Sequence, residues 1–119
     1  DLGLINCLTI SGNKILLAGY QKVSNKGLIF VSDDYGSTWS LSMSGYDQAY
    51  SPTDFVTGSN GDIYLASAIY DNSIKGYIHK LYKSINQGAS WTEINTKGLT
   101  ELGVINCLKI SGNKILLEG

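Results

Sequence analysis

An internal repeat is the feature of this sequence that most constrains its fold. Residues 1–19 read DLGLINCLTISGNKILLAG and residues 101–119 read ELGVINCLKISGNKILLEG, with 15 of 19 positions identical. A weaker copy, TDFVTGSNGDIYLAS, lies midway between them at residues 53–67. The repeating unit is therefore about 50 residues long and is present in two and a half copies. Such a period is typical of units that bury their apolar faces only by stacking on their neighbours.

Each unit is predicted to form four short strands. Short apolar or alternating runs favour strands, and no segment has a convincing helical period. Gly and Asn, which tolerate positive φ, lie between the first two strands of each unit. The predicted strands are residues 4–10, 14–19, 27–32, 38–43, 53–58, 62–69, 77–84, 90–95, 104–110 and 114–118. Four antiparallel strands in ~50 residues is the size of a propeller blade, so the sequence predicts an all-β fold of β-propeller blades.

The repeat also sets the expected blade boundaries. Residues 1–52 form the first blade, residues 53–100 the second, and residues 101–119 the first two strands of a third. A closed propeller needs about four to eight blades. We therefore expect further blades as partners, either from a longer chain of which this is a piece, which the near-duplicate ends favour, or from other copies associating head to tail.

A second pattern recurs once in each complete unit. Residues 32–39 read SDDYGSTW and residues 84–91 read SINQGASW, so both fit S-x-D/N-x-G-x-S/T-W. This pattern resembles the Asp box, or BNR repeat, of sialidases, sortilin-type receptors, xyloglucan-cleaving glycosidases and many secreted bacterial propellers. The resemblance implies an Asp-box β-propeller in which the box lies at the rim, away from the ligand-binding face.

We expect the motif residues to be structural. The Asp or Asn side chain can fold back onto backbone N–H groups of the turn, and the Gly supplies a conformation that a Cβ would obstruct. The Thr or Ser can add a second side-chain bond, while the Trp is expected to be buried between outer strands. The motif residues are Ser32, Asp34, Gly36, Thr38, Trp39, Ser84, Asn86, Gly88, Ser90 and Trp91.

Catalysis is not expected from this chain. The sialidase resemblance would require an arginine triad for the substrate carboxylate, and the sequence contains no Arg. A glycosidase would need paired carboxylates. Asp54 is the best acid candidate, because it is expected to match Asn6 and Asn106 at the entry of the inner strand in the other units. We favour a capping role for that position.

The sequence predicts neither a cofactor nor a metal. Its single histidine, His79, lies in a predicted strand and is read as structural, and no CxxC motif or Cys/His cluster is present. Cys7 and Cys107 occupy equivalent places two blades apart, which favours buried thiols over a disulfide. No glycine-rich phosphate loop precedes a helix.

The charge pattern narrows the partners. All nine basic residues are scattered Lys and the net charge is −1, so nucleic acid is not expected. No apolar run approaches the ~20 residues of a transmembrane helix. The use of Lys without Arg, with abundant Ile and Asn, suits an AT-rich bacterial genome.

Loops opposite the boxes are the predicted ligand-binding region. The resemblance implies that the loops between second and third strands, and between blades, line that face. They carry flat rings beside amide and carboxylate groups, which suit a sugar face or a protein surface. The candidate ligand residues are Tyr46, Asp47, Gln48, Tyr50 and Tyr70.

Together these features predict a non-catalytic, extracellular or cell-envelope β-propeller module that binds protein or glycan. Two alternatives stay open: a non-catalytic portion of a larger Asp-box glycoside hydrolase, and a structural spacer in a surface repeat protein.

Overall fold

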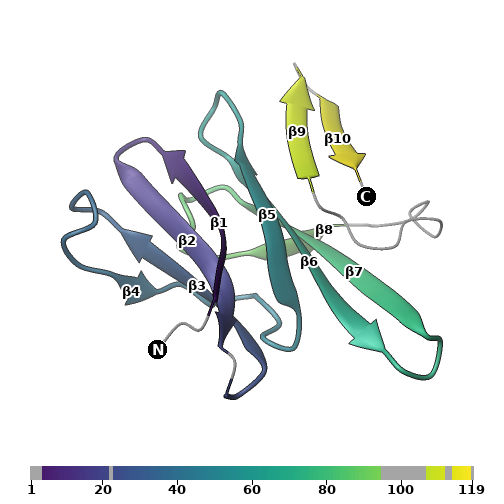
Figure 1. Ribbon diagram of the computed structural model, residues 1–119. Coiled ribbons are helices and arrows are strands. Elements are labelled where there is room, and N and C mark those ends of the chain that lie inside the picture. The colour runs from purple at the N-terminus through teal and green to yellow at the C-terminus, as the bar shows by residue number, and fades with distance from the viewer. Residues whose placement is uncertain (1–3, 22, 95–106, 112–113, 119) are drawn as a thin grey trace.

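A computed structural model describes residues 4–21, 23–94, 107–111 and 114–118, and this part of the chain contains strands and turns but no helix (Figure 1). The strands are β1 (Leu4–Ser11), β2 (Lys14–Gln21), β3 (Lys26–Ser32), β4 (Ser40–Leu41), β5 (Ser51–Thr57), β6 (Ile63–Asp71), β7 (Gly76–Ser84), β8 (Thr92–Ile94), β9 (Cys107–Ser111) and β10 (Lys114–Glu118).

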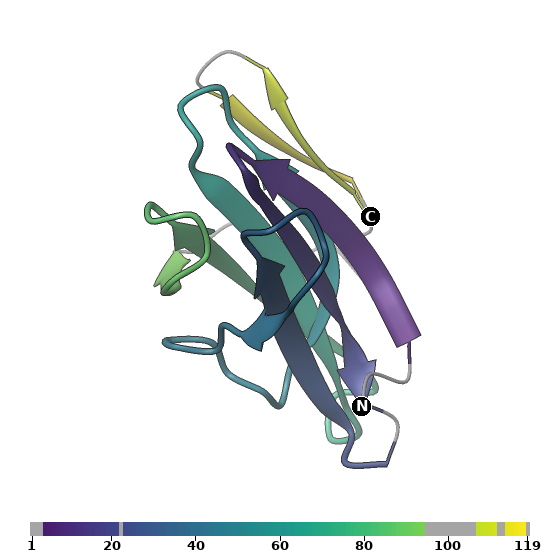
Figure 2. The same cartoon turned by 90° about the vertical axis from the view of Figure 1, so that its left-hand side faces the viewer.

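The strands form three antiparallel sheets. The order is β1-β2-β3-β4 in the first, β5-β6-β7-β8 in the second, and a β9-β10 hairpin in the third. The predicted all-β fold, with blades of four antiparallel strands, is confirmed. The first two sheets are called blade 1 and blade 2 below. Figure 2 places β4 and β8 on the opposite side of the molecule from β1 and the β9–β10 hairpin.

The fourth strand of each blade is shorter than predicted. The sequence predicts strands over residues 38–43 and 90–95, whereas β4 and β8 begin two residues later. The reason is local: the backbone N–H groups of Thr38 and Ser90 donate to side chains of their own turns rather than to a neighbouring strand. The first part of predicted strand 104–110 lies outside the described residues.

The register corrects one alignment made from sequence. Asp54 on β5 pairs with Ala66, as Cys7 on β1 pairs with Ala18, so Asp54 corresponds to Cys7 and not to Asn6. In both blades the pairing skips the residue just before this position. The skipped residue on β1 is Asn6, which lies between the paired residues Ile5 and Cys7. Such a bulge places an extra residue on one strand and bends it. The expected match of Asp54 with the asparagines is therefore wrong.

The main core lies between the two four-stranded sheets. The ring of Trp91 stacks on that of Phe55, with centroids 5.9 Å apart, and Trp91 Nε1 donates to the Ser42 carbonyl of blade 1 at 3.1 Å. Blade 1 contributes β2 and β3 side chains, and blade 2 contributes side chains of β5, β6, β7 and the residue before β8. The buried residues of this core are Leu16, Ala18, Ile29, Tyr46, Phe55, Ile63, Leu65, Tyr82 and Trp91.

Polar contacts between β1 and the region of β5 fix the position of one blade along the other. Asn6 Nδ2 donates to the Pro52 carbonyl at 2.8 Å, and Ser11 Oγ donates to the Gly61 carbonyl at 2.8 Å. Between these two ends, the hydroxyls of Thr9 and Thr57 lie 2.7 Å apart. Since the bonds are spread along the inner strands, a shift of one residue would break all of them.

The β9–β10 hairpin packs on the other face of blade 2. Leu108 is buried against Ala66 and Leu81, and its backbone N–H donates to Asp54 Oδ2 at 2.6 Å. The register of this hairpin repeats that of β1–β2, with Ser111 opposite Lys114 as Ser11 is opposite Lys14. The near-identical sequences thus form the same hairpin.

The two tryptophans occupy equivalent backbone positions but differ in burial. Trp91 is 4% exposed because blade 1 covers it, whereas Trp39 is 38% exposed. Within their own turns they match, since a Cβ on Gly36 or Gly88 would lie 3.7 Å from the respective Trp Cζ2. The expectation that both rings are buried therefore holds for Trp91 alone.

This difference gives a stability prediction. Replacing Trp91 with Ala should lower the free energy of unfolding by about 3–5 kcal/mol, since it removes a fully packed ring from the core. The matched variant Trp39→Ala should cost about 1 kcal/mol or less, because that ring is partly in solvent. Urea unfolding monitored by circular dichroism measures both. Equal losses for the two variants would contradict the inter-blade core described above.

Candidate functional site

The sheets place the two groups of predicted site residues at opposite ends. Ser32, where the first box begins, pairs with Ile15 at the start of β2, while Lys26 at the other end of β3 pairs with Gln21. The second blade repeats this arrangement, with Ser84 opposite Ile63. The boxes therefore lie at one end of the blades, and the β2–β3 and β6–β7 turns lie at the other.

The first box is closed by a network of short hydrogen bonds. Asp34 Oδ1 accepts from the Thr38 backbone N–H at 2.8 Å and from Ser32 Oγ at 2.7 Å. Thr38 Oγ1 donates to Asp34 Oδ2 at 2.5 Å, and Ser32 Oγ accepts from the Gly36 N–H at 2.8 Å. These contacts hold the carboxylate inside its own turn.

The second box repeats this network bond for bond. Asn86 Oδ1 accepts from the Ser90 N–H at 3.0 Å and from Ser84 Oγ at 2.9 Å. Asn86 Nδ2 donates to Ser90 Oγ at 2.8 Å, and Ser84 Oγ accepts from the Gly88 N–H at 2.8 Å. The amide thus replaces the carboxylate with the direction of one bond reversed, so the turn does not require a charge.

Two features of the boxes could not be predicted from the motif alone. The serine hydroxyl bridges the Asp or Asn side chain to the glycine N–H, and the residue before the glycine is left-handed. Its φ is +59° at Tyr35 and +57° at Gln87, ahead of +93° at Gly36 and +89° at Gly88. The variable position immediately before the glycine therefore carries backbone strain that the surrounding bonds maintain.

The hydrogen bonds alter the acidity of Asp34. The Thr38 hydroxyl, the Thr38 N–H and the Ser32 hydroxyl together lower the pKa of its carboxyl to about 2. They do so because each bond stabilises the ionised form. Asp34 is thus a fixed anion already engaged by its own turn, which makes it a poor proton donor.

At the opposite end, the loop before β5 has some side chains in the core and others at the surface. Tyr46 is 7% exposed, its ring centroid lies 4.9 Å from that of Tyr82, and its hydroxyl donates to the Tyr50 carbonyl at 2.6 Å. Burial raises the pKa of Tyr46. The side chain predicted to meet a ligand is therefore part of the core.

The other residues of that loop are held by local contacts. Asp47 accepts from the Ala49 N–H at 3.0 Å and its Oδ2 lies 3.1 Å from Lys80 Nζ; the first contact and, to a lesser extent, the second hold the pKa of its carboxyl below the usual value. The same ammonium group lies 4.7 Å from the Tyr50 ring centroid. The Gln48 carbonyl accepts from the Gly27 N–H at 2.9 Å and ties the loop to blade 1.

Tyr70 is the predicted ligand residue that lies at a cavity. A hollow of about 400 Å³ opens between the β2–β3 and β6–β7 hairpins, and Tyr70, Tyr20 and Tyr77 line it. The Tyr70 and Tyr77 rings meet edge to face, with centroids 5.2 Å apart. The Tyr20 hydroxyl donates to Asn25 Oδ1 on the far side. The remaining lining residues are Asn25, Ala49, Ser51, Ala68 and Ile69.

Tyr20, Asn25 and Tyr77 were not among the residues predicted from sequence. One signal could have identified Tyr77: the segment YDNSIKGY places Tyr70 and Tyr77 on either side of a turn, where cross-strand pairs form. The structure pairs them directly. Tyr20 and Asn25 join the set because blade 1 packs beside blade 2.

Cys7, Asp54 and His79, the residues considered for chemistry from the sequence, do not line this cavity. Cys7 is a free, partly buried thiol whose pKa is raised to about 12 by burial and, to a lesser extent, by the Asp54 charge. Asp54 itself accepts the Leu108 and Phe55 N–H groups and holds strands together. Burial lowers the pKa of His79 on β7. The side chain of Cys107 lies outside the described residues.

The described part of the chain has no candidate metal centre and no candidate membrane-spanning helix. Within the described ranges, no group of three or more His, Cys, Asp or Glu side chains is placed to hold a metal ion. No helix in that same part of the chain is long and apolar enough to cross a membrane.

The sequence matches no model of a known protein family, and no curated protein matches it significantly.

The first box gives a testable prediction about acidity. The Asp34 carboxyl should titrate with a midpoint near pH 2, and Thr38→Ala should raise that midpoint because it removes the strongest bond to the anion. Since the folded-state pKa is lowered, the stabilisation is complete above the ordinary Asp pKa of about 3.9 and disappears as the pH falls through about 2. Carboxyl-carbon NMR measures the titration.

The second box supplies the matched control. Ser90→Ala removes the equivalent hydroxyl beside Asn86, which does not titrate, so it should leave the Asp34 midpoint unchanged. A wild-type midpoint close to 4 would show that the network does not stabilise the ionised form.

Proposed function

We propose that this chain is a non-catalytic binding module of an Asp-box β-propeller, located outside the cytoplasm or in the cell envelope, and that it binds glycan at the tyrosine-lined cavity. The observation that carries the proposal is the convergence of Tyr20, Tyr70 and Tyr77 on one hollow between two blades. A binding function for protein or glycan follows from the loops, and the cavity favours glycan.

The chemistry of the cavity suits a sugar ring. Aromatic rings offer flat apolar faces, and the tyrosine hydroxyls and the Asn25 amide offer hydrogen bonds at their margins. The volume of about 400 Å³ lies within the range of small-molecule sites. Among the described lining residues there is no charged side chain, which favours a neutral ligand.

The absence of catalysis is part of the proposal. The acid candidate Asp54 already accepts two backbone N–H groups, and the carboxylate of Asp47 is paired with Lys80. Asp71, at the end of β6, accepts from the Ser73 hydroxyl and N–H, which hold its pKa below the usual value. A glycosidase acid instead needs a raised pKa and a second carboxylate facing it across the substrate.

The Asp-box assignment is supported by the matching networks of the two turns. In both, the serine, the Asp or Asn and the glycine make equivalent bonds at equivalent places. The extracellular or envelope location rests on the resemblance of these turns to secreted propellers. Bacterial origin and secretion belong to the same proposal.

The proposal predicts the outcome of substitutions at the cavity. On a glycan array, the chain should bind neutral glycans, and Tyr70→Ala and Tyr77→Ala should each weaken the best hit by roughly tenfold or more, about 1.4 kcal/mol. Titration calorimetry measures the dissociation constants. Both rings are partly exposed, so the loss should come without unfolding.

Tyr35→Ala is the matched control, since that ring is 82% exposed and lies in the first box, at the opposite end of the blade. Its affinity should equal that of the wild type. Glycan binding that survives the cavity substitutions would place the site elsewhere, and a chain with no glycan ligand at all would favour the structural-spacer alternative.

A further inference from the structure

Blade 1 presents an apolar face that the described residues leave partly exposed, whereas its counterpart on blade 2 is buried. By strand register, Leu8 corresponds to Phe55 and Leu17 to Leu65. On blade 2 these residues pack on blade 1, whereas Leu8 is 56% exposed. The blade 1 residues at positions buried in blade 2 are Leu8, Ile15, Leu17, Phe30 and Trp39. We call this set the front face of blade 1.

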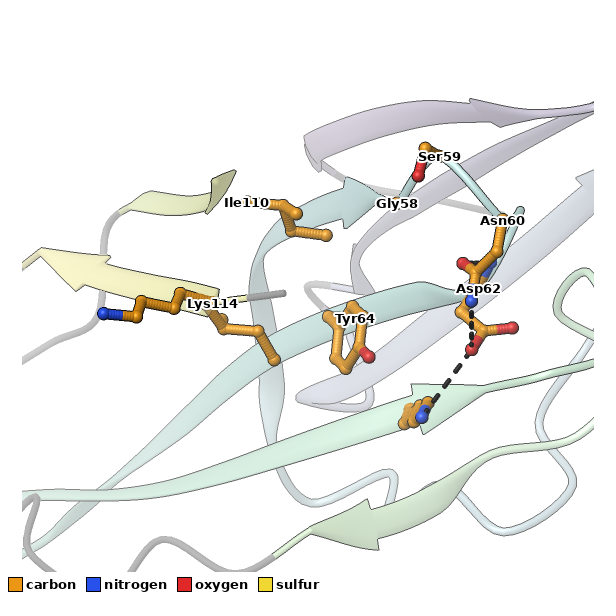
Figure 3. A pocket seen from close by; sticks show the side chains of 9 residues that line it. Gly58, Ser59, Asn60, Asp62, Tyr64, Ile110 and Lys114 are labelled. Carbon is orange, nitrogen blue, oxygen red and sulfur yellow. Dashed lines mark hydrogen bonds and ion pairs between the residues drawn. The ribbon is translucent and has the colours of Figure 1, made fainter. Parts of the chain in front are cut away.

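A complementary hollow lies on the far side of blade 2. It has a volume of about 270 Å³ and lies between the β5–β6 turn and the β9–β10 hairpin (Figure 3). Two of its lining residues, Lys83 and Asp62, form an ion pair with Nζ and Oδ2 3.6 Å apart. The lining residues are Gly58, Ser59, Asn60, Asp62, Tyr64, Lys83, Ile110, Lys114 and Ile115.

The equivalent place on blade 1 is filled by the second box. Gln87 Nε2 donates to the Ser11 carbonyl at 3.1 Å, and a Cβ on Gly88 would lie 2.5 Å from Leu16 Cδ2. In register, Leu16 corresponds to Tyr64, which lines the hollow on blade 2. The hollow is thus the seat of a third box, and none of its described lining residues belongs to one.

The chain contains the element that fits this seat. The hairpin wall of the hollow is made of Ile110, Lys114 and Ile115, and the β1–β2 hairpin carries the same residue types at the same register positions. The β1–β2 hairpin of blade 1 can therefore line the hollow with the same residue types as β9–β10. It adds a complete box whose Tyr35, the counterpart of Gln87, is exposed.

We propose that blade 1 of a second copy of this chain docks by its front face on blade 2, displaces the β9–β10 hairpin, and inserts its first box into the hollow. The Leu8 N–H would then meet Asp54 Oδ2, as the Leu108 N–H does now. The new interface is a continuation of the blade 1–blade 2 interface. Because it joins different surfaces head to tail, it can extend or close into a ring.

Competition with the tethered hairpin sets the conditions for assembly. The hairpin belongs to the same chain as blade 2, so it competes for the face of blade 2 at an effective concentration of about millimolar. Blade 1 of the second copy competes at its concentration in solution, but it also packs its third and fourth strands on blade 2. Wild-type chain should therefore assemble only as its concentration rises. Loosening the hairpin with Leu108→Asp should strengthen assembly by roughly tenfold or more, because the face of blade 2 that Leu108 covers becomes free for the second copy.

Light scattering coupled to gel filtration, from 10 µM to about 1 mM, tests the proposal. Leu108→Asp should form head-to-tail oligomers, and the double variant Leu8→Asp, Leu108→Asp should stay monomeric. Val23→Asp is the matched control, since Val23 is a 97% exposed apolar residue outside the front face and should change nothing. Urea unfolding monitored by circular dichroism verifies that each variant keeps its core.

If Leu108→Asp disturbs that core, Leu108→Ala replaces it and should act in the same direction with a smaller effect. A folded hairpin variant that stays monomeric at about 1 mM would overturn the proposal. So would oligomers that persist when Leu8→Asp is added, because they would have formed through another surface.

Discussion

The packing of one four-stranded sheet against the next is the interaction on which the rest of this structure depends. Phe55, Leu65 and Trp91 of blade 2 cover Leu16 and Ala18 of blade 1, and neither set is hidden within its own sheet. The same contact sets the hairpins of the two blades side by side. Stability and the tyrosine-lined cavity therefore have one origin, since the cavity walls come from both blades.

Most of the fold could be predicted from the sequence because its determinants are local. Period, alternation and turn residues place the strands, and the all-β blades follow. The register of the inner strands could not be predicted, because the turn of the weaker copy carries one additional residue. That residue shifts the alignment of β5 against β1 by one position without changing the pattern of apolar residues. Asp54 was consequently matched to the wrong position.

The candidate site was predictable only in part. Tyr46 and Tyr70 were both assigned to polar loops from the sequence, yet Tyr46 is in the core and Tyr70 lies at the end of β6 beside the cavity. The difference depends on Tyr82, whose hydroxyl accepts the Asp47 N–H at 3.2 Å from 35 residues further along the chain. Contacts of that kind are invisible in a local pattern. The motif, by contrast, was informative because the bonds that close each turn join residues of the motif itself.

The hydrogen bonds within each box are short in sequence separation, and this separation affects the order in which the parts of the chain fold. Their side-chain bonds join residues two to four positions apart, whereas the bond from Trp91 to Ser42 spans 49. Ring closure over a few residues costs far less chain entropy than closure over fifty. Each turn can thus close early and hold its indole at a set angle before any neighbour arrives. On this basis we expect each box turn to form before the two sheets pack together, and the packing of blade 2 on blade 1 to be the slower, later step.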